Sequence, residues 1–133
     1  MNEKEKEQLI KVIKNNAIWP LVIEGLNSAF FKNAVIIDCQ KGANQLAIRI
    51  TDQGYQRPEF LTALEAAKQN RKFLILENLE HLNNEQQYSF AGFLKHKGSN
   101  GYKLPANTQI IITTSSVDKL SDDIKALSII YKI

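Results

Sequence analysis

Five polar residues and one glycine lie at the ends of four short apolar runs in this 133-residue sequence. They are Glu24, Gly25, Asp38, Glu77, Asn78 and Ser115. If the runs are parallel strands, their carboxyl ends meet at one edge of a sheet, where open α/β sheets usually bind ligands. The six residues are therefore a candidate ligand-binding site, and the alternative is a plain polar rim at the strand tips.

Lysines gather in a second polar segment, which also contains an aromatic residue. Lys95, Lys97, Tyr102 and Lys103 fall within nine residues. They are a candidate weak nucleic-acid-binding edge, because phosphate contacts by three lysines give a low, salt-sensitive affinity. The alternative is a solvated surface loop.

Other chemistry has little support in the sequence. His81 and His96 are the only histidines, and neither has a neighbour at metal-ligand spacing, so we expect no metal site and no cofactor. No G-x-S-x-G segment indicates a nucleophilic serine. Cys39 is the single cysteine, which excludes an internal disulfide, and its apolar context indicates a small buried side chain rather than a reactive thiol.

The first half of the chain is expected to supply one helix and two or three strands. Asn2 can cap a helix whose apolar residues recur at helical spacing as far as Ala17. The apolar runs 19–24 and 34–38 indicate buried strands, and 46–50 is a candidate third strand. Gly42 and Asn44 suit a turn, so 46–50 could form a hairpin with 34–38 or follow a loop.

The second half alternates strands and helices. Pro58 suits the first turn of a helix, 73–76 is a continuous apolar strand, and Asn83 or Asn84 can cap the next helix. Apolar residues expected on that helix include Tyr88. A polar loop at 98–105, a buried strand at 110–112, a short helix at 121–126 and a last strand at 128–131 follow. This alternation predicts a single α/β domain over 1–133, a three-layer αβα sandwich with a mostly parallel sheet.

These pieces resemble, in their order, the core of AAA+ ATPases, most closely the MoxR-like and helicase-loader type. The segments that carry the resemblance are FLILENLEHL, EQQYSFAGFLK, HKGSNGYKLPANT, QIIITTSS and LSDDIKALSIIYKI, which run from Phe73 to Ile133. The entry helix and PLVIEG look like the family's first elements. The resemblance implies a reduced P-loop-NTPase-like sheet, and it is an analogy at the level of the fold.

The groups that carry the family's chemistry are missing or altered. A P-loop, G-x-x-x-x-G-K-[ST], should begin at Gly25, but none of the six glycines is followed by Lys. Nine residues, 25–33, separate the first two expected strands, whereas a crossover with a helix needs roughly 10–12 or more. The acidic pair Asp-Glu, which holds Mg²⁺ and polarises water, corresponds to Glu77 and Asn78, and the polar sensor corresponds to Ser115. No Arg lies near 125–128 for an arginine finger, and the chain ends before a helical lid.

These departures predict a catalytically inactive ATPase-like domain, since positioning and charge stabilisation are nearly all that a protein contributes to phosphoryl transfer. We expect no enzyme activity and a role in protein–protein contact, with an AAA+ ATPase or a second copy as partner. The alternatives are a weak nucleic-acid-binding accessory protein and a nucleotide or small-ligand sensor without hydrolysis. The net charge of +3 does not favour nucleic acid strongly. No apolar stretch approaches the ~20 residues of a membrane span, and no signal peptide is evident, so we expect a cytoplasmic protein.

Overall fold

The computed structural model describes all residues from 1 to 133. The chain begins with the helix α1, Glu3–Asn15, as predicted. The Asn2 side chain accepts a hydrogen bond from the Glu5 amide at 2.8 Å, and Glu3 and Glu5 lie in the first turn, where the helix dipole favours negative charge. Asn16 ends the helix. No helix is both long enough and apolar enough to span a membrane.

A five-stranded sheet forms the centre of the molecule, and all its pairings are parallel. Its strands are β1 (Leu21–Glu24), β2 (Val35–Asp38), β5 (Lys72–Glu77), β8 (Thr108–Thr114) and β9 (Ile129–Lys132). Their order across the sheet is β2-β5-β8-β1-β9. Each strand overlaps an apolar run of the sequence, and the predicted α/β class with a mostly parallel sheet is confirmed.

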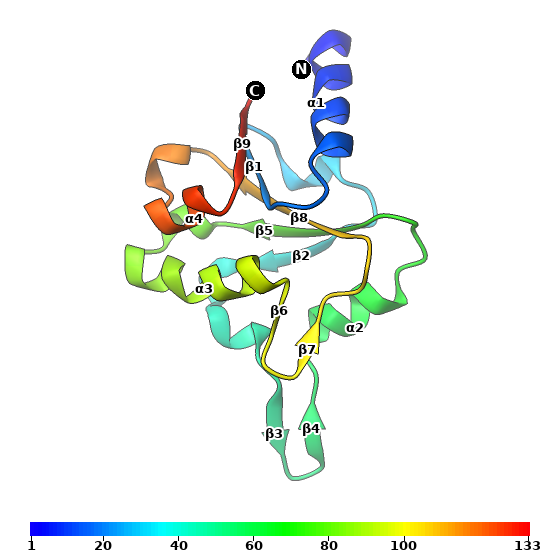
Figure 1. The fold of residues 1–133 in the computed structure, drawn as a ribbon, viewed down its shortest axis with the longest axis vertical. Helices are drawn as coiled ribbons and strands as arrows, with labels where there is room; N and C mark the ends of the chain where they lie inside the picture. Colours follow the sequence, from blue (N-terminus) through cyan, green and yellow to red (C-terminus); the bar gives the residue numbers. More distant parts are fainter.

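The direction of each crossover decides which face its connection covers. From β1 the chain moves to one edge of the sheet, and every later crossover moves the opposite way. Because parallel crossovers are right-handed, the first connection and the later ones lie on opposite faces. The later ones carry α2 (Glu59–Ala66), α3 (Asn84–His96) and α4 (Asp122–Ala126). Figure 1 shows α2 and α3 across the sheet from α1, which completes three layers.

The two faces of the sheet bury unequal cores. On the side of α2, α3 and α4, 20 buried residues form one cluster. On the side of α1, the cluster has seven buried residues. Alternation along β1 divides the strand between them, since Leu21 and Ile23 belong to the smaller cluster and Val22 to the larger. The α1 face is thin because the β1–β2 connection supplies only the 3-10 turn η1, Ser28–Phe30.

The candidate strand over 46–50 is confirmed only in its last two residues, Arg49 and Ile50. Residues Ala43–Leu46 form a 3-10 turn, η3, and the chain then leaves the sheet as a hairpin of β3 (Arg49–Thr51) and β4 (Gly54–Gln56). The Gln45 side-chain amide donates to the carbonyls of Asp38 and Gly42, both at 2.8 Å, which holds the turn after β2. Strand β2 lies at the edge of the sheet with β5 as its one partner, and β3 pairs with β4, so a hairpin between 46–50 and 34–38 is excluded.

Two further details differ from the expectations. The segment 98–105, expected as a loop, contains a short hairpin of β6 (Gly98–Ser99) and β7 (Tyr102–Lys103). On α3, Asn83 is the cap: its side chain accepts from the Gln86 amide, and its own amide donates to the Gln86 side chain. Tyr88, expected on the apolar face of the helix, lies on the solvent side and is 64% exposed. Its neighbours Phe90 and Phe93 face the core instead.

Candidate functional site

Three neighbouring strands bring the predicted polar residues to one edge of the sheet. The carboxyl ends of β1, β5 and β8 lie side by side, and the chain leaves β1 toward one face and β8 toward the other. Ligands of open α/β sheets bind at such switch points. A depression of about 300 Å³ lies there. Its lining includes Gly25, Ser28, Glu77, Asn78, Glu80, His81, Thr114 and Ser115.

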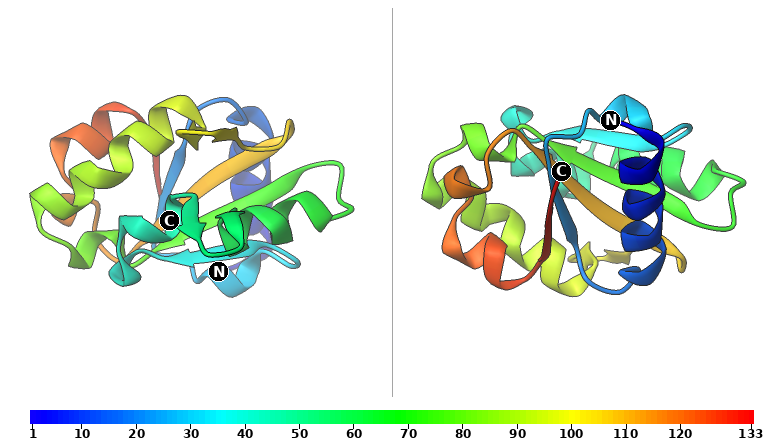
Figure 2. Two further views of the ribbon diagram at one scale, coloured as in Figure 1. Left: turned by 90° about the horizontal axis from the view of Figure 1, so that it is seen from below. Right: turned by 90° about the horizontal axis from the view of Figure 1, so that it is seen from above.

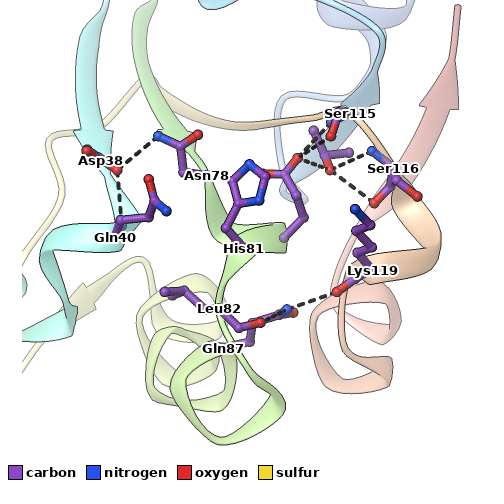
Figure 3. A network of polar contacts seen from close by, with 11 residues as sticks. Asp38, Gln40, Asn78, His81, Leu82, Gln87, Ser115, Ser116 and Lys119 are labelled. Carbon is purple, nitrogen blue, oxygen red and sulfur yellow. Dashed lines mark hydrogen bonds and ion pairs between the residues drawn. The ribbon is translucent and has the colours of Figure 1, made fainter.

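Two carboxylates in this depression are held by hydroxyl and amide donors. Glu77, at the end of β5, accepts a hydrogen bond from the Ser28 hydroxyl at 2.6 Å. Glu80 is 7% exposed and accepts from the Ser115 amide at 2.7 Å and from the Thr114 hydroxyl. Figure 3 labels Ser115 of this network, together with Ser116 and His81. The depression therefore contains two acids and no lysine or arginine.

Glu80 was not among the predicted site residues. It lies in η4 (Leu79–His81), a 3-10 turn that begins after Asn78, whose backbone is left-handed with φ 67°. Asparagine tolerates that conformation better than most residues. The turn directs Glu80 back under β8, and three hydrogen-bond donors replace the water that a buried carboxylate loses. The sequence offers one indication of its role, since Glu80 lies only two residues after Asn78 at the end of the predicted strand.

Asp38 lies at the neighbouring tip of β2. Its carboxylate accepts a hydrogen bond from the Asn78 side chain at 3.0 Å and from the Gln40 amide at 3.1 Å. These two bonds, the first above all, lower the pKa of Asp38 below the ordinary value of an aspartate, with a smaller contribution from Lys41. Asp38 lines a separate, larger depression of about 1030 Å³, which shares Glu77 with the first.

Glu24 is turned away from the others. Its carboxylate accepts from the Val117 amide at 2.7 Å, at the start of η5 (Val117–Lys119). It satisfies a backbone donor of that turn and does not line the depression. The structure thus brings together Gly25, Glu77, Asn78 and Ser115, links Asp38 to them through Asn78, and separates Glu24.

The predicted nucleic-acid edge loses its aromatic residue. Tyr102 is 9% exposed, and its hydroxyl donates to the Leu46 carbonyl. Burial raises its pKa to about 12. The expectation that Tyr102 is part of an exposed edge is therefore wrong, since its ring packs in the larger core and is closed to a stacking base. Lys95 and Lys103 are exposed, and Lys97 ends α3 with φ 52°.

Cys39 is buried, as predicted, at the base of the same edge of the sheet. Burial first, and then the carboxylates of Asp38, Glu80 and Glu77, raise the pKa of its thiol. A thiol in this environment stays protonated and is a poor nucleophile. Nowhere in the chain do three His, Cys, Asp or Glu side chains converge as a metal site would require.

Comparisons with known proteins find similarity at the level of the fold. No family model matches the chain, and neither does any curated protein sequence. A γ-subunit-related protein of DNA polymerase III from Thermotoga maritima matches its structure with a TM-score of 0.54 and 17% identity. The match covers 96% of this chain and 45% of the other, so this chain spans less than half of that protein. At this identity the likeness shows the fold alone, and it agrees with the α/β fold with a mostly parallel sheet that the sequence predicts.

Proposed function

We propose that this chain is a catalytically inactive, AAA+-like domain that acts through contacts with other proteins. The observation that carries the proposal is the charge of the depression at the tips of β1, β5 and β8. A site for a nucleoside triphosphate needs cations to balance the phosphates. Glu77 and Glu80 supply negative charge in the depression instead, and no lysine or arginine lines it. Without a lysine or arginine beside them, the two carboxylates leave the charge of a triphosphate unbalanced.

The backbone after β1 supports the same proposal. Phosphate-binding loops present free N–H groups at the start of a helix. Here the amides of Gly25, Phe30 and Phe31 donate to carbonyls within the protein, at 3.0 Å each. The Ala29 amide donates to the Asn27 side chain at 2.8 Å. These four amides are therefore engaged within the protein. Only a three-residue 3-10 turn follows, so the connection lacks the dipole of a full helix.

The residues at the end of β5 support the absence of hydrolysis. Asn78 corresponds to the residue that would polarise the attacking water, and its side chain donates to Asp38. A carboxamide cannot act as a general base. Glu77, which corresponds to the Mg²⁺ ligand, accepts from Ser28. Asn78 therefore cannot take the role that its position would have in an active enzyme.

Titration calorimetry and thermal unfolding with ATP, ADP and Mg²⁺ test the nucleotide half of the proposal, with an active P-loop ATPase as positive control. We expect no heat of binding, no phosphate release and no change in melting temperature. A ligand at about 100 times its Kd would add about 2.7 kcal/mol of stability, which is readily measured. Stabilisation by ATP that is lost in Glu77→Ala would overturn this half in favour of a nucleotide sensor.

The interaction half rests on the AAA+-like fold without the means of turnover. The structural neighbour is named as a relative of a DNA polymerase III subunit, which makes a subunit of such an assembly a reasonable partner. Light scattering on the purified 15.1 kDa chain tests self-association. Affinity capture followed by reconstitution from purified components tests a separate ATPase partner. If the chain is strictly monomeric and forms no complex with a purified ATPase, the interaction role is contradicted. The result of the nucleotide-binding test is independent of that outcome.

A further inference from the structure

An apolar groove lies beside α1, on the thinly covered face of the sheet. Figure 2 shows α1 as the one long helix over this face. The β1–β2 connection passes beside it with only the turn η1. A groove of about 920 Å³ remains between α1, the residues that follow η1 and the start of β5. This volume is within the range of small-ligand and peptide-anchor pockets.

The floor of the groove is aromatic. Phe30, Phe31 and Phe73 form a row, with ring centroids 5.3 Å apart for each neighbouring pair. Phe31 is buried, whereas Phe30 and Phe73 are each partly open to solvent. Ile10 of α1 adds an apolar wall and is 38% exposed. Apolar side chains that are gathered in one groove and bordered by polar residues are a feature of interaction sites.

The rim of the groove is cationic. Lys6 and Lys14 come from α1, Lys32 follows η1, Arg71 precedes β5, and Glu3 is the single acid. None of the four cations forms an ion pair with a carboxylate of the chain. Arg71 reaches only carbonyl and amide oxygens, at 3.3 to 3.5 Å. The groove therefore combines an apolar floor with positive charges that no carboxylate of the chain neutralises.

We propose that this groove binds an acidic peptide segment of a partner protein, with aromatic or aliphatic anchor residues on the floor and carboxylates at the rim. Anchors of this type contribute most of the binding energy in small interfaces, and complementary charge sets register and association rate. Nucleic acid fits less well, since Phe31 is buried and Phe30 and Phe73 are only partly exposed, which limits the stacking of bases on their rings. The proposal rests on the proposed interaction role and specifies the partner's chemistry.

Panning a random 12-residue phage-displayed peptide library on the full chain tests the proposal. We expect enrichment of sequences in which Asp or Glu flank Phe, Trp, Leu or Ile. An enriched peptide, labelled with fluorescein, is then titrated by anisotropy against Lys6→Gln/Lys14→Gln/Lys32→Gln. Loss of three exposed ion pairs should weaken binding roughly tenfold. The matched control, Lys95→Gln/Lys103→Gln/Lys119→Gln, lowers the net charge equally and should bind as the unaltered chain does.

A second pair of variants tests the apolar contact. Ile10→Ser, in the groove, should weaken the same peptide, whereas Ile18→Ser, which is exposed outside it, should not. The proposal would be overturned if no peptide is enriched, or if the enriched peptides are basic or purely apolar. It would also be overturned if both triple-lysine variants lose the same peptide affinity. Lysine-dependent binding to phosphatidylglycerol vesicles, or lysine-dependent dimers in light scattering, would likewise overturn it, because these results would assign the groove to lipid or to a second copy. If the groove variants capture a partner protein as well as the unaltered chain does, the partner binds elsewhere. That result would overturn the groove proposal and leave the proposed interaction role intact.

Discussion

Glu80 is buried beneath the tip of β8, where its side chain is 3% exposed. Replacing it with alanine leaves the Ser115 amide without its acceptor and the Thr114 hydroxyl with only the Ser116 carbonyl. Loss of hydrogen bonds to a buried charge should lower the free energy of unfolding by about 2–3 kcal/mol. Urea denaturation measures this change. The control Glu7→Ala, at an exposed position within α1, should change it by less than about 0.5 kcal/mol. A loss as small for Glu80→Ala would show that Glu80 does not hold the strand tips together.

The pKa of Asp38 provides a second test at the scale of single residues. The Asn78 side chain is the main cause of its lowered value. Because the folded pKa is depressed, the stabilisation is present above the unfolded pKa, about 3.9, and is lost as the pH falls through the folded value. Asn78→Gly keeps a residue that accepts the left-handed backbone and removes the hydrogen bond.

Carbon-detected NMR titration of the Asp38 carboxyl checks this prediction. The pKa should rise in Asn78→Gly, and the variant should lose less stability than the unaltered chain as the pH falls below 4 or so. Asn84→Gly, which touches no carboxylate of the site, is a control for the titration. An unchanged pKa in Asn78→Gly would assign the shift to the Gln40 amide and Lys41 instead.

Single residues of the site were predictable where their position follows directly from a strand. Glu77, Asn78 and Ser115 end apolar runs, and parallel pairing brings them together. Glu24 also ends a strand, but the carboxylate bends toward the Val117 amide, a partner 93 positions away. Such a long-range choice of hydrogen-bond partner has no local signal. The burial of Glu80 likewise depends on a backbone turn that hydrophobic periodicity does not encode.

At the scale of elements, α1 is attached to the sheet through its last turn. The buried Gln109 side chain donates to the carbonyls of Ile13 and Asn16, at 2.9 and 3.0 Å. These carbonyls have no partner within the helix end. Gln109→Ala should therefore cost about 1–3 kcal/mol and loosen α1 selectively.

Hydrogen exchange followed by mass spectrometry measures that loosening. Amides of α1 should exchange faster in Gln109→Ala, while those of β5 change in proportion to global stability alone. Gln8→Ala, at an exposed position of the same helix, should leave exchange unaltered. Equal acceleration in α1 and β5 would mean that the helix does not open as a separate unit.

The elements that the sequence predicts well are those that bury a continuous apolar run. The strands β5 and β8 extend the predicted runs 73–76 and 110–112 by a few residues. By contrast, every residue of the β3–β4 hairpin is exposed, including the cross-strand pair Ile50 and Tyr55. A strand with no buried face has no alternation to detect, so β4 was missed and the candidate strand 46–50 covered only two residues of β3.

At the scale of the whole molecule, the three central strands belong to both cores. Ile23, Ile75 and Ile111 face α1, while their neighbours Val22, Leu76 and Ile112 face the opposite helices. Neither core can lose its packing without exposing strands that the other core needs. The unequal faces should therefore unfold together, as a single cooperative unit.

Leu9→Ala and Leu64→Ala test this coupling, since each removes a fully buried side chain from one of the two cores. Each should cost about 2–5 kcal/mol. Trp19, the only tryptophan, precedes β1 and reports unfolding by fluorescence, while circular dichroism reports the helices. Because the cores share their strands, both probes should give one urea transition with the same midpoint in each variant, and a slope equal to that of the unaltered chain. Separate midpoints in Leu9→Ala would mean that α1 and the thin face unfold first, and that the larger core is a domain by itself.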